Sequence, residues 1–247
     1  MLRAPTARRY RSVPDLGSRL LSQARLVVVP DPSRVDAARQ LGAREVVAAL
    51  PAQLPLAHGL PPSPARPAPW LWGRRVVVVG PLVCERVRPL VESLAAQPPD
   101  TDLVLLGDGP DGDRIAEIAD GLVLGHRVHV DPRPTWEIVD AHLQHADVVA
   151  TASDVTDDTP VLLRAMALGR PVLATDVDER RHLVSPGVDG ILVAAGDRWS
   201  LAGGLRRLLT DAPLATALGD AGARRVAARD WSDVAGEVLT AVAALES

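Results

Sequence analysis

Aromatic side chains make up only 2% of the 247 residues, and the chain contains no phenylalanine and no lysine. The volume of the core must therefore come from Val, Leu, Ile and Ala. A lone cysteine, Cys84, can form no disulfide within the chain and cannot build a thiolate metal site, so we interpret it as a small buried residue. All 27 basic residues are arginine, and Ala, Gly, Pro and Val are abundant, a composition that we associate with a GC-rich bacterial genome.

Long apolar runs and an excess of positive charge are absent too. No run approaches the ~20 apolar residues of a membrane span, and the basic N-terminal segment lacks the apolar core of a signal peptide. A formal charge of −4 and a pI near 5.9 argue against a basic surface for nucleic acid. We therefore expect a cytoplasmic protein without a membrane span and without a nucleic acid partner.

Motifs for metal binding and for nucleophilic serine chemistry are missing as well. The six histidines form neither an HExxH motif nor a group with the cysteine, and there is no GxSxG elbow. Asp176 and Asp178 resemble an acid pair that holds a divalent ion, but hard cations need more oxygen ligands than this stretch offers. We therefore expect no metal and no cofactor.

Short runs rich in Val and Leu alternate with segments of helical length. Runs without polar alternation are typical of strands that are covered on both faces of a parallel sheet. Strands and helices that take turns indicate an α/β fold with a doubly wound parallel sheet, Rossmann-like in type. Strands are expected at 25–30, 45–50, 74–80, 101–107, 126–130, 146–151, 170–176 and 190–195, and helices at 87–97, 113–122, 135–145, 160–168 and in the segment after residue 200.

A proline-rich stretch divides the chain. Seven prolines fall between Pro51 and Pro69, which forbids a helix and favours an extended connector. We expect an N-terminal α/β remnant at 1–50, a linker at 51–69 and a larger α/β domain at 70–247. The remnant has too few elements to enclose a core, so we expect residues 14–50 to pack against a partner chain or a second copy.

The segment GDGPDG, residues 107–112, follows an expected strand and matches the letters of the GxGxxG dinucleotide fingerprint. Three nearby acids would repel a pyrophosphate and Pro110 removes one backbone N–H, so we reject the dinucleotide interpretation. Two alternatives stay open: a tight turn from strand to helix, and a turn whose backbone borders some other nucleotide.

The helix expected at 160–168 directly follows the strand at 146–151. Thr159 suits its N-cap, Pro160 its first position and Gly169 its C-terminal cap. Its unsatisfied amides would lie at the carboxyl edge of the sheet, where open α/β sheets bind ligands. Arg164, one turn further along, either binds an anion or only pairs with Asp157 or Asp158.

Taken together, these segments resemble the family 4 glycosyltransferases, enzymes with the two-domain GT-B fold. The resemblance runs from about residue 74 to 239 and rests, in this order, on VVVVGPLVCERVRPLVESLA, LVLLGDGPDGDRIAEIA, RVHV, ADVVATASDVTDDTPVLLRAMALGRPVLATDV and SPGVDGILVAAGD. Residues 25–50 are similar to the last repeat of the family's N-terminal domain. The resemblance implies transfer of a sugar from a UDP- or GDP-type nucleotide sugar to an acceptor, with retention of anomeric configuration and without a metal.

The resemblance also implies a donor site. Arg86 stands where the family has a lysine that meets the diphosphate, and Asp157 stands beside the position of the first of two family glutamates, so we assign both as catalytic. The residues assigned to donor binding are Gly80, Gly107, Gly109, Thr156, Asp158, Thr159, Pro160, Val161 and Arg164.

Several positions depart from the family pattern. Pro81 replaces a first-loop arginine, Val87 a glycine, Thr156 the first glutamate and Arg164 the second, while Asp178 and Glu179 replace paired glycines. A guanidinium has donors only and cannot hold a ribose diol as a carboxylate does. The hypotheses are therefore a retaining glycosyltransferase, a catalytically inactive relative that serves as a binding or scaffolding module, and another GT-B activity such as sugar-nucleotide epimerisation.

Overall fold

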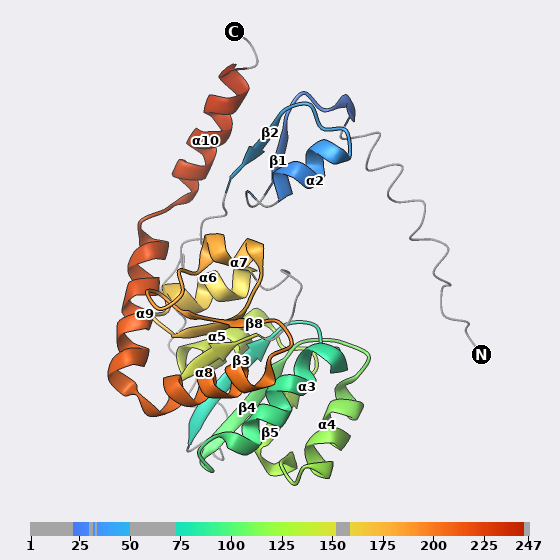
Figure 1. Cartoon of the computed structure of the whole chain (residues 1–247), viewed down its shortest axis with the longest axis vertical. Coiled ribbons are helices and arrows are strands. Elements are labelled where there is room, and N and C mark those ends of the chain that lie inside the picture. Colours follow the sequence, from blue (N-terminus) through green and yellow to red (C-terminus); the bar gives the residue numbers. More distant parts are fainter. Residues whose placement is uncertain (1–21, 30–31, 33, 50–72, 152–158, 245–247) are drawn as a thin grey trace, which may run out of the picture. The chain divides into compact units, whose positions relative to one another are not determined.

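The computed structural model describes residues 22–29, 32, 34–49, 73–151 and 159–244 (Figure 1). The chain divides into two compact units, Met1–Ala52 with Asp230–Ser247, and Gln53–Arg229. The linker expected at 51–69 lies outside the described residues. Within the described ranges, no helix is both long and apolar enough to cross a membrane.

The first unit contains a small βαβ motif. Strands β1 (Val27–Val29) and β2 (Val46–Ala48) pair in parallel, and α2 (Arg34–Gln40) connects them. Ala38 of α2 is buried against Val29, so the helix covers one face of the two strands. Both strands fall within the ranges expected from the sequence.

The last helix, α10 (Trp231–Ala244), belongs to this first unit and not to the second. Its Val234 is buried against Ala49, and Val238 packs on the same cluster. The domain expected at 70–247 therefore ends before α10, because the apolar contacts of this helix are made with the N-terminal part of the chain.

The second unit is built on a parallel sheet of six strands in the order β5-β4-β3-β6-β7-β8. Numbered within the unit, this order is 3-2-1-4-5-6, that of a Rossmann fold. The direction in which successive strands are added to the sheet reverses between β3 and β6, which is the switch point of the fold. The expected doubly wound α/β fold is thus confirmed. The strands are β3 (Arg74–Val79), β4 (Thr101–Leu106), β5 (Val128–Asp131), β6 (Val148–Ala150), β7 (Val172–Asp176) and β8 (Ile191–Ala194).

Helices cover both faces of this sheet (Figure 1). Side chains alternate along β3, so Val76 and Val78 join the core on one face while Val77 joins the core on the other. The first core includes residues of α3, α4 and α8, and the second includes residues of α5, α6 and the end of α9. The helices are α3 (Cys84–Ser93), α4 (Gly112–Gly121), α5 (Trp136–Gln144), α6 (Thr159–Ala167), α7 (Asp178–Leu183), α8 (Arg198–Thr210) and α9 (Ala212–Ala227).

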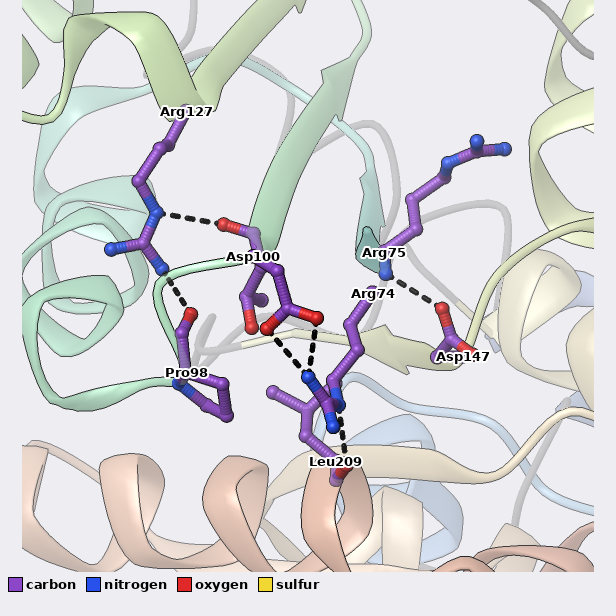
Figure 2. A network of polar contacts seen from close by, with 8 residues as sticks. Arg74, Arg75, Pro98, Asp100, Arg127, Asp147 and Leu209 are labelled. Atoms are coloured by element: carbon purple, nitrogen blue, oxygen red, sulfur yellow. Dashed lines mark hydrogen bonds and ion pairs between the residues drawn. The ribbon is translucent and has the colours of Figure 1, made fainter. Parts of the chain in front are cut away.

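A network of polar contacts lies at the amino edge of the sheet, where the strands begin (Figure 2). The guanidinium of Arg74 donates to both carboxylate oxygens of Asp100, at 2.5 and 2.6 Å, and to the Leu209 carbonyl at 2.9 Å. Arg127 donates to the Pro98 and Thr101 carbonyls, each at 2.8 Å. These contacts connect the loops at the amino edge of the sheet. Ligands of open α/β sheets bind at the opposite, carboxyl edge, so the candidate site is described there.

Candidate functional site

The GDGPDG segment forms a tight turn that packs against the loop after β3. The Leu82 amide donates to the Asp108 carbonyl at 3.0 Å, and the Gly80 amide donates to the Leu106 carbonyl at 3.0 Å. A Cβ at Gly107 would lie 1.9 Å from the Gly80 carbonyl oxygen, and one at Gly109 would lie 2.4 Å from that of Leu82. Both glycines are therefore required by the close approach of two backbones at the carboxyl edge.

The acids of this segment act as local hydrogen-bond acceptors. The Asp111 carboxylate accepts from the Cys84 amide at 2.9 Å, at the first residue of α3, and Asp108 accepts from the Gly109 amide at 2.9 Å. Asp111 thus satisfies one of the free N–H groups at the start of α3. The tight-turn interpretation accounts for these residues, and whether the turn also borders a nucleotide stays a prediction.

Helix α6 begins at Thr159, close to the predicted start, and follows β6 at the switch point of the sheet. Pro160 is exposed and Val161 is buried, so the first turn has one face toward solvent and one toward the core. Gly169 ends the helix in the left-handed conformation, with φ of 66°, as the predicted cap requires. Thr156, Asp157 and Asp158 lie outside the described residues.

Arg164 is held by a neighbouring helix. Its guanidinium makes a two-pronged ion pair with Asp140 of α5 and lies 5.9 Å from the ring centroid of Trp136. Asp140 is buried, with a side chain only 7% exposed. Neither Asp140 nor Trp136 was singled out from the sequence, because they lie 24 and 28 residues from Arg164 and no local pattern connects them. The assignment of Arg164 to the donor site stays a prediction.

The acid pair Asp176 and Asp178 binds an arginine. Arg181 donates to both carboxylate oxygens of Asp176, at 2.6 and 2.9 Å, and to Asp178 at 3.0 Å. These hydrogen bonds, together with the positive charge of Arg181, hold the pKa of Asp176 below its ordinary value. Among the described residues, no three His, Cys, Asp or Glu side chains form a group that could hold a metal ion.

The arginine that binds these acids, Arg181, lies on a helix that the sequence analysis did not predict. Helix α7 has only six residues, too few for a clear amphipathic pattern. Its Arg180 is fully buried and donates to the Thr175 carbonyl at 3.2 Å. Of the two arginines, Arg181 therefore binds the acids at the end of β7, whereas Arg180 binds a backbone carbonyl.

A pocket of about 250 Å³ opens at the carboxyl ends of β7 and β8, between α3 and α8. The half-buried Arg86, assigned from the sequence as the diphosphate contact, is one of its lining residues. The residues around it are Glu85, Arg86, Pro89, Thr175, Val193, Ala194, Ala195, Gly196, Asp197, Arg198 and Leu201. The pocket and the turn at 107–112 thus lie at the same edge of one sheet.

Parts of this chain are similar in sequence to glycosyltransferases with named activities. A phosphatidyl-myo-inositol mannosyltransferase of Mycobacterium leprae is 43% identical over 79 residues, which cover 32% of this chain and 21% of the relative. A D-inositol 3-phosphate glycosyltransferase of Corynebacterium urealyticum is 32% identical over 143 residues, covering 55% of this chain and 34% of the relative. The matched regions are thus about a third or less of these relatives' own lengths.

Solved structures show the same fold. Sucrose-phosphate synthase from Thermosynechococcus elongatus superposes with a TM-score of 0.79 at 24% identity, over 98% of this chain and 64% of that one. HepE of Anabaena, in complex with UDP and glucose, gives a TM-score of 0.77 at 19% identity, over 97% of this chain and 68% of that one. Residues 73–211, more than half of the chain, match the family model described as glycosyl transferases group 1. The chain belongs to this family of glycosyltransferases, which have the GT-B fold.

Proposed function

We propose that the second unit binds a nucleotide diphosphate sugar, of UDP or GDP type, at the carboxyl edge of its sheet, and that the protein transfers the sugar to an acceptor with retention. The observation that carries the proposal is that Arg86, the turn at 107–112 and the start of α6 belong to one edge of a sheet in Rossmann order. The donor complexes of HepE support the choice of ligand.

The proposed chemistry is stabilisation of a departing diphosphate. The guanidinium of Arg86 and the amides at the start of α6 would interact most strongly when negative charge builds up on the leaving group. Asp157 would contact the transferred sugar. No step in this proposal uses a metal, because the positive charge comes from Arg86 and from the helix start.

Binding of UDP and of GDP by calorimetry tests this proposal. Arg86→Gln should weaken the affinity for the nucleotide about 10-fold or more, because a hydrogen bond to a charged group contributes roughly 1.5 to 3 kcal/mol. Arg88→Gln is the matched control: it lies on the same helix, is 56% exposed and pairs with Glu92 at 2.6 Å. Absence of binding at millimolar nucleotide, or an equal loss in both variants, would contradict the proposal.

A second candidate is a catalytically inactive relative that binds a nucleotide or a partner chain over residues 14–50. Arg164 favours it, because a guanidinium paired with Asp140 cannot supply the carboxylate expected at the ribose. A measurement of UDP-glucose or GDP-mannose hydrolysis distinguishes the active transferase from the inactive relative. Turnover that is lost in Arg86→Gln supports the transferase, whereas nucleotide binding without turnover, in a protein that elutes as a complex or dimer, supports the binding module.

A further inference from the structure

We propose that α5 is a pH-sensitive switch: protonation of His142 releases the end of this helix from the sheet and weakens the ion pair of Asp140 with Arg164, which connects α5 to α6. The switch would regulate the carboxyl edge from the opposite edge of the sheet, and it does not rest on the proposed function. Three features of the molecule support it: the charges beneath α5, the surroundings of His142, and the contacts at the start of the helix.

Charged residues lie side by side on the sheet, on the face that α5 covers. In the parallel register Arg75 of β3 lies beside Asp102 of β4, and the Arg75 amide donates to the Asp147 carboxylate at 2.7 Å (Figure 2). Arg75 and Val77 share one face of β3, and Val77 belongs to the core that α5 and α6 cover. Arg75 is only 3% exposed. A buried guanidinium therefore lies beneath α5.

His142 of α5 faces this guanidinium. Its Nδ1 atom is buried and has no hydrogen-bond partner among the residues that the structure describes. Burial lowers the pKa of His142 and the charge of Arg75 lowers it further, whereas Asp131 opposes the shift. The charged and titratable groups that face His142 are Arg75 of β3, Asp131 and His129 of β5, and His145 of α5 itself. The packed helix therefore favours a neutral imidazole.

A proton on His142 would add a second positive charge beside Arg75. The acids nearby already have partners: Asp102 contacts His129, with 3.3 Å between Oδ1 and Nε2, and Asp147 accepts from the Arg75 amide. An imidazolium in the released end of α5 would instead be hydrated by water. As the pH falls below about 6.5, the ordinary pKa of histidine, the released form therefore binds more protons than the packed form. Acid thus shifts the equilibrium towards release.

The other end of α5 lies at the carboxyl edge. Helix α5 has nine residues, so it is only about 14 Å long and its two ends are close together. Trp136 is its first residue, and Asp140, two residues before His142, makes the buried ion pair with Arg164 of α6. Movement of the helix end therefore displaces the carboxylate that fixes Arg164.

Amide exchange of the full chain tests the switch, followed by mass spectrometry at pH 7.5 and pH 5.5 and corrected for the intrinsic exchange rate. In the wild type we expect the protection of α5 and α6 to fall at least about 5-fold between the two pH values, and that of β3 and β4 to change by less than about 2-fold. His142→Gln should keep the protection of α5 within about 2-fold at both values. His126→Gln is the matched control, since His126 is exposed and precedes β5, and it should behave like the wild type.

A second variant tests the sign of the effect. Asp131→Asn removes the carboxylate that favours protonation of His142, so release of α5 should need a lower pH than in the wild type. An NMR titration of the imidazole gives the midpoint in each protein. Equal losses of protection in the wild type and His142→Gln, or no loss in the wild type at a pH where His142 is protonated, would overturn the proposal. So would a loss spread evenly over α5, α6, β3 and β4, because it would report unfolding of the whole unit.

Discussion

Arg164 of α6 forms an ion pair with Asp140 of α5, whose carboxylate is buried, with only 7% of its side chain exposed. A guanidinium that meets a carboxylate with two parallel N–H groups is fixed in direction as well as in position. Arg164 therefore connects α6 to α5, the helices that follow β6 and β5. This structural role is present whether or not a ligand contacts Arg164.

Removal of the acid from this pair should destabilise the protein. Asp140→Asn should lower the free energy of unfolding by about 2 kcal/mol, less than the roughly 3 to 5 kcal/mol of fully buried pairs, because the Arg164 side chain is 23% exposed. Glu92→Gln, which breaks the exposed Arg88 pair, should cost only about 0.5 kcal/mol. Urea denaturation compares the two variants. Equal losses would mean that the buried pair has no special role.

His142 of α5 gives a prediction for the pH dependence of stability. Burial lowers its pKa below the ordinary 6.5, nearby Arg75 lowers it further, and Asp131 opposes the shift. The unfolded chain therefore takes up a proton before the folded protein as the pH falls through about 6.5. The free energy of unfolding should therefore decrease as the pH falls below about 6.5. The decrease should stop once the pH is below the pKa of His142 in the folded protein.

Urea denaturation at pH 7.5 and pH 5.5 measures this effect. His142→Gln removes the ionisable group and should lose less stability over this interval than the wild type. Other histidines titrate in the same range, so the difference between the two proteins, and not the total change, reports on His142. A variant with the same loss as the wild type would contradict the assignment.

At the scale of elements, the loops after β3 and β4 depend on glycine. Gly107→Ala would place a Cβ 1.9 Å from the Gly80 carbonyl oxygen, and a backbone atom cannot move aside as a flexible side chain can. We expect a loss of about 3 kcal/mol in the free energy of unfolding, at the upper end of overpacking effects. Thermal or urea denaturation measures it.

Gly112→Ala is the control for this prediction. Gly112 is the first residue of α4 and has no atom within 4 Å of its would-be Cβ. Alanine there should change the free energy of unfolding by no more than about 1 kcal/mol, since alanine favours a helix over glycine. If both variants lose the same free energy of unfolding, the close packing of the two loops does not explain why glycine is needed at position 107.

At the scale of the whole molecule, the first unit depends on a helix from the far end of the chain. Two strands and one helix bury little surface, and Ala49 finds apolar cover in Val234 and Val238 of α10. A chain that ends at Arg229 should therefore show faster amide exchange in β1 and β2 and unchanged exchange in β3 to β8.

Hydrogen exchange followed by mass spectrometry measures this difference. A chain that ends at Ala244 keeps α10 and is the control. If β1 and β2 are equally protected in both truncated chains, α10 does not stabilise the first unit. If β3 to β8 also lose protection, the second unit is not independent of the helix.

The eight strands found in the described part of the chain, their alternation with helices and the Rossmann-like class were predictable from the sequence. Runs of Val and Leu and the flanking turns are local signals. The cap at Gly169 and the start of α6 were predictable for the same reason: Thr159, Pro160 and Gly169 act on their own neighbours. The short helix α7 was missed, since six residues carry too little periodicity.

The sequence alone thus determined the strands, most of the helices and the family. Only the tertiary structure decided which side chains meet: Asp140 with Arg164, Asp111 with the start of α3, Arg181 with Asp176, and α10 with the first unit. Each of these contacts connects different segments of the chain, and all depend on how the backbone places each side chain. The physical reason is that hydrophobic periodicity acts within a segment, whereas the partner of a charged or capping group is set by which segments the folded sheet brings side by side.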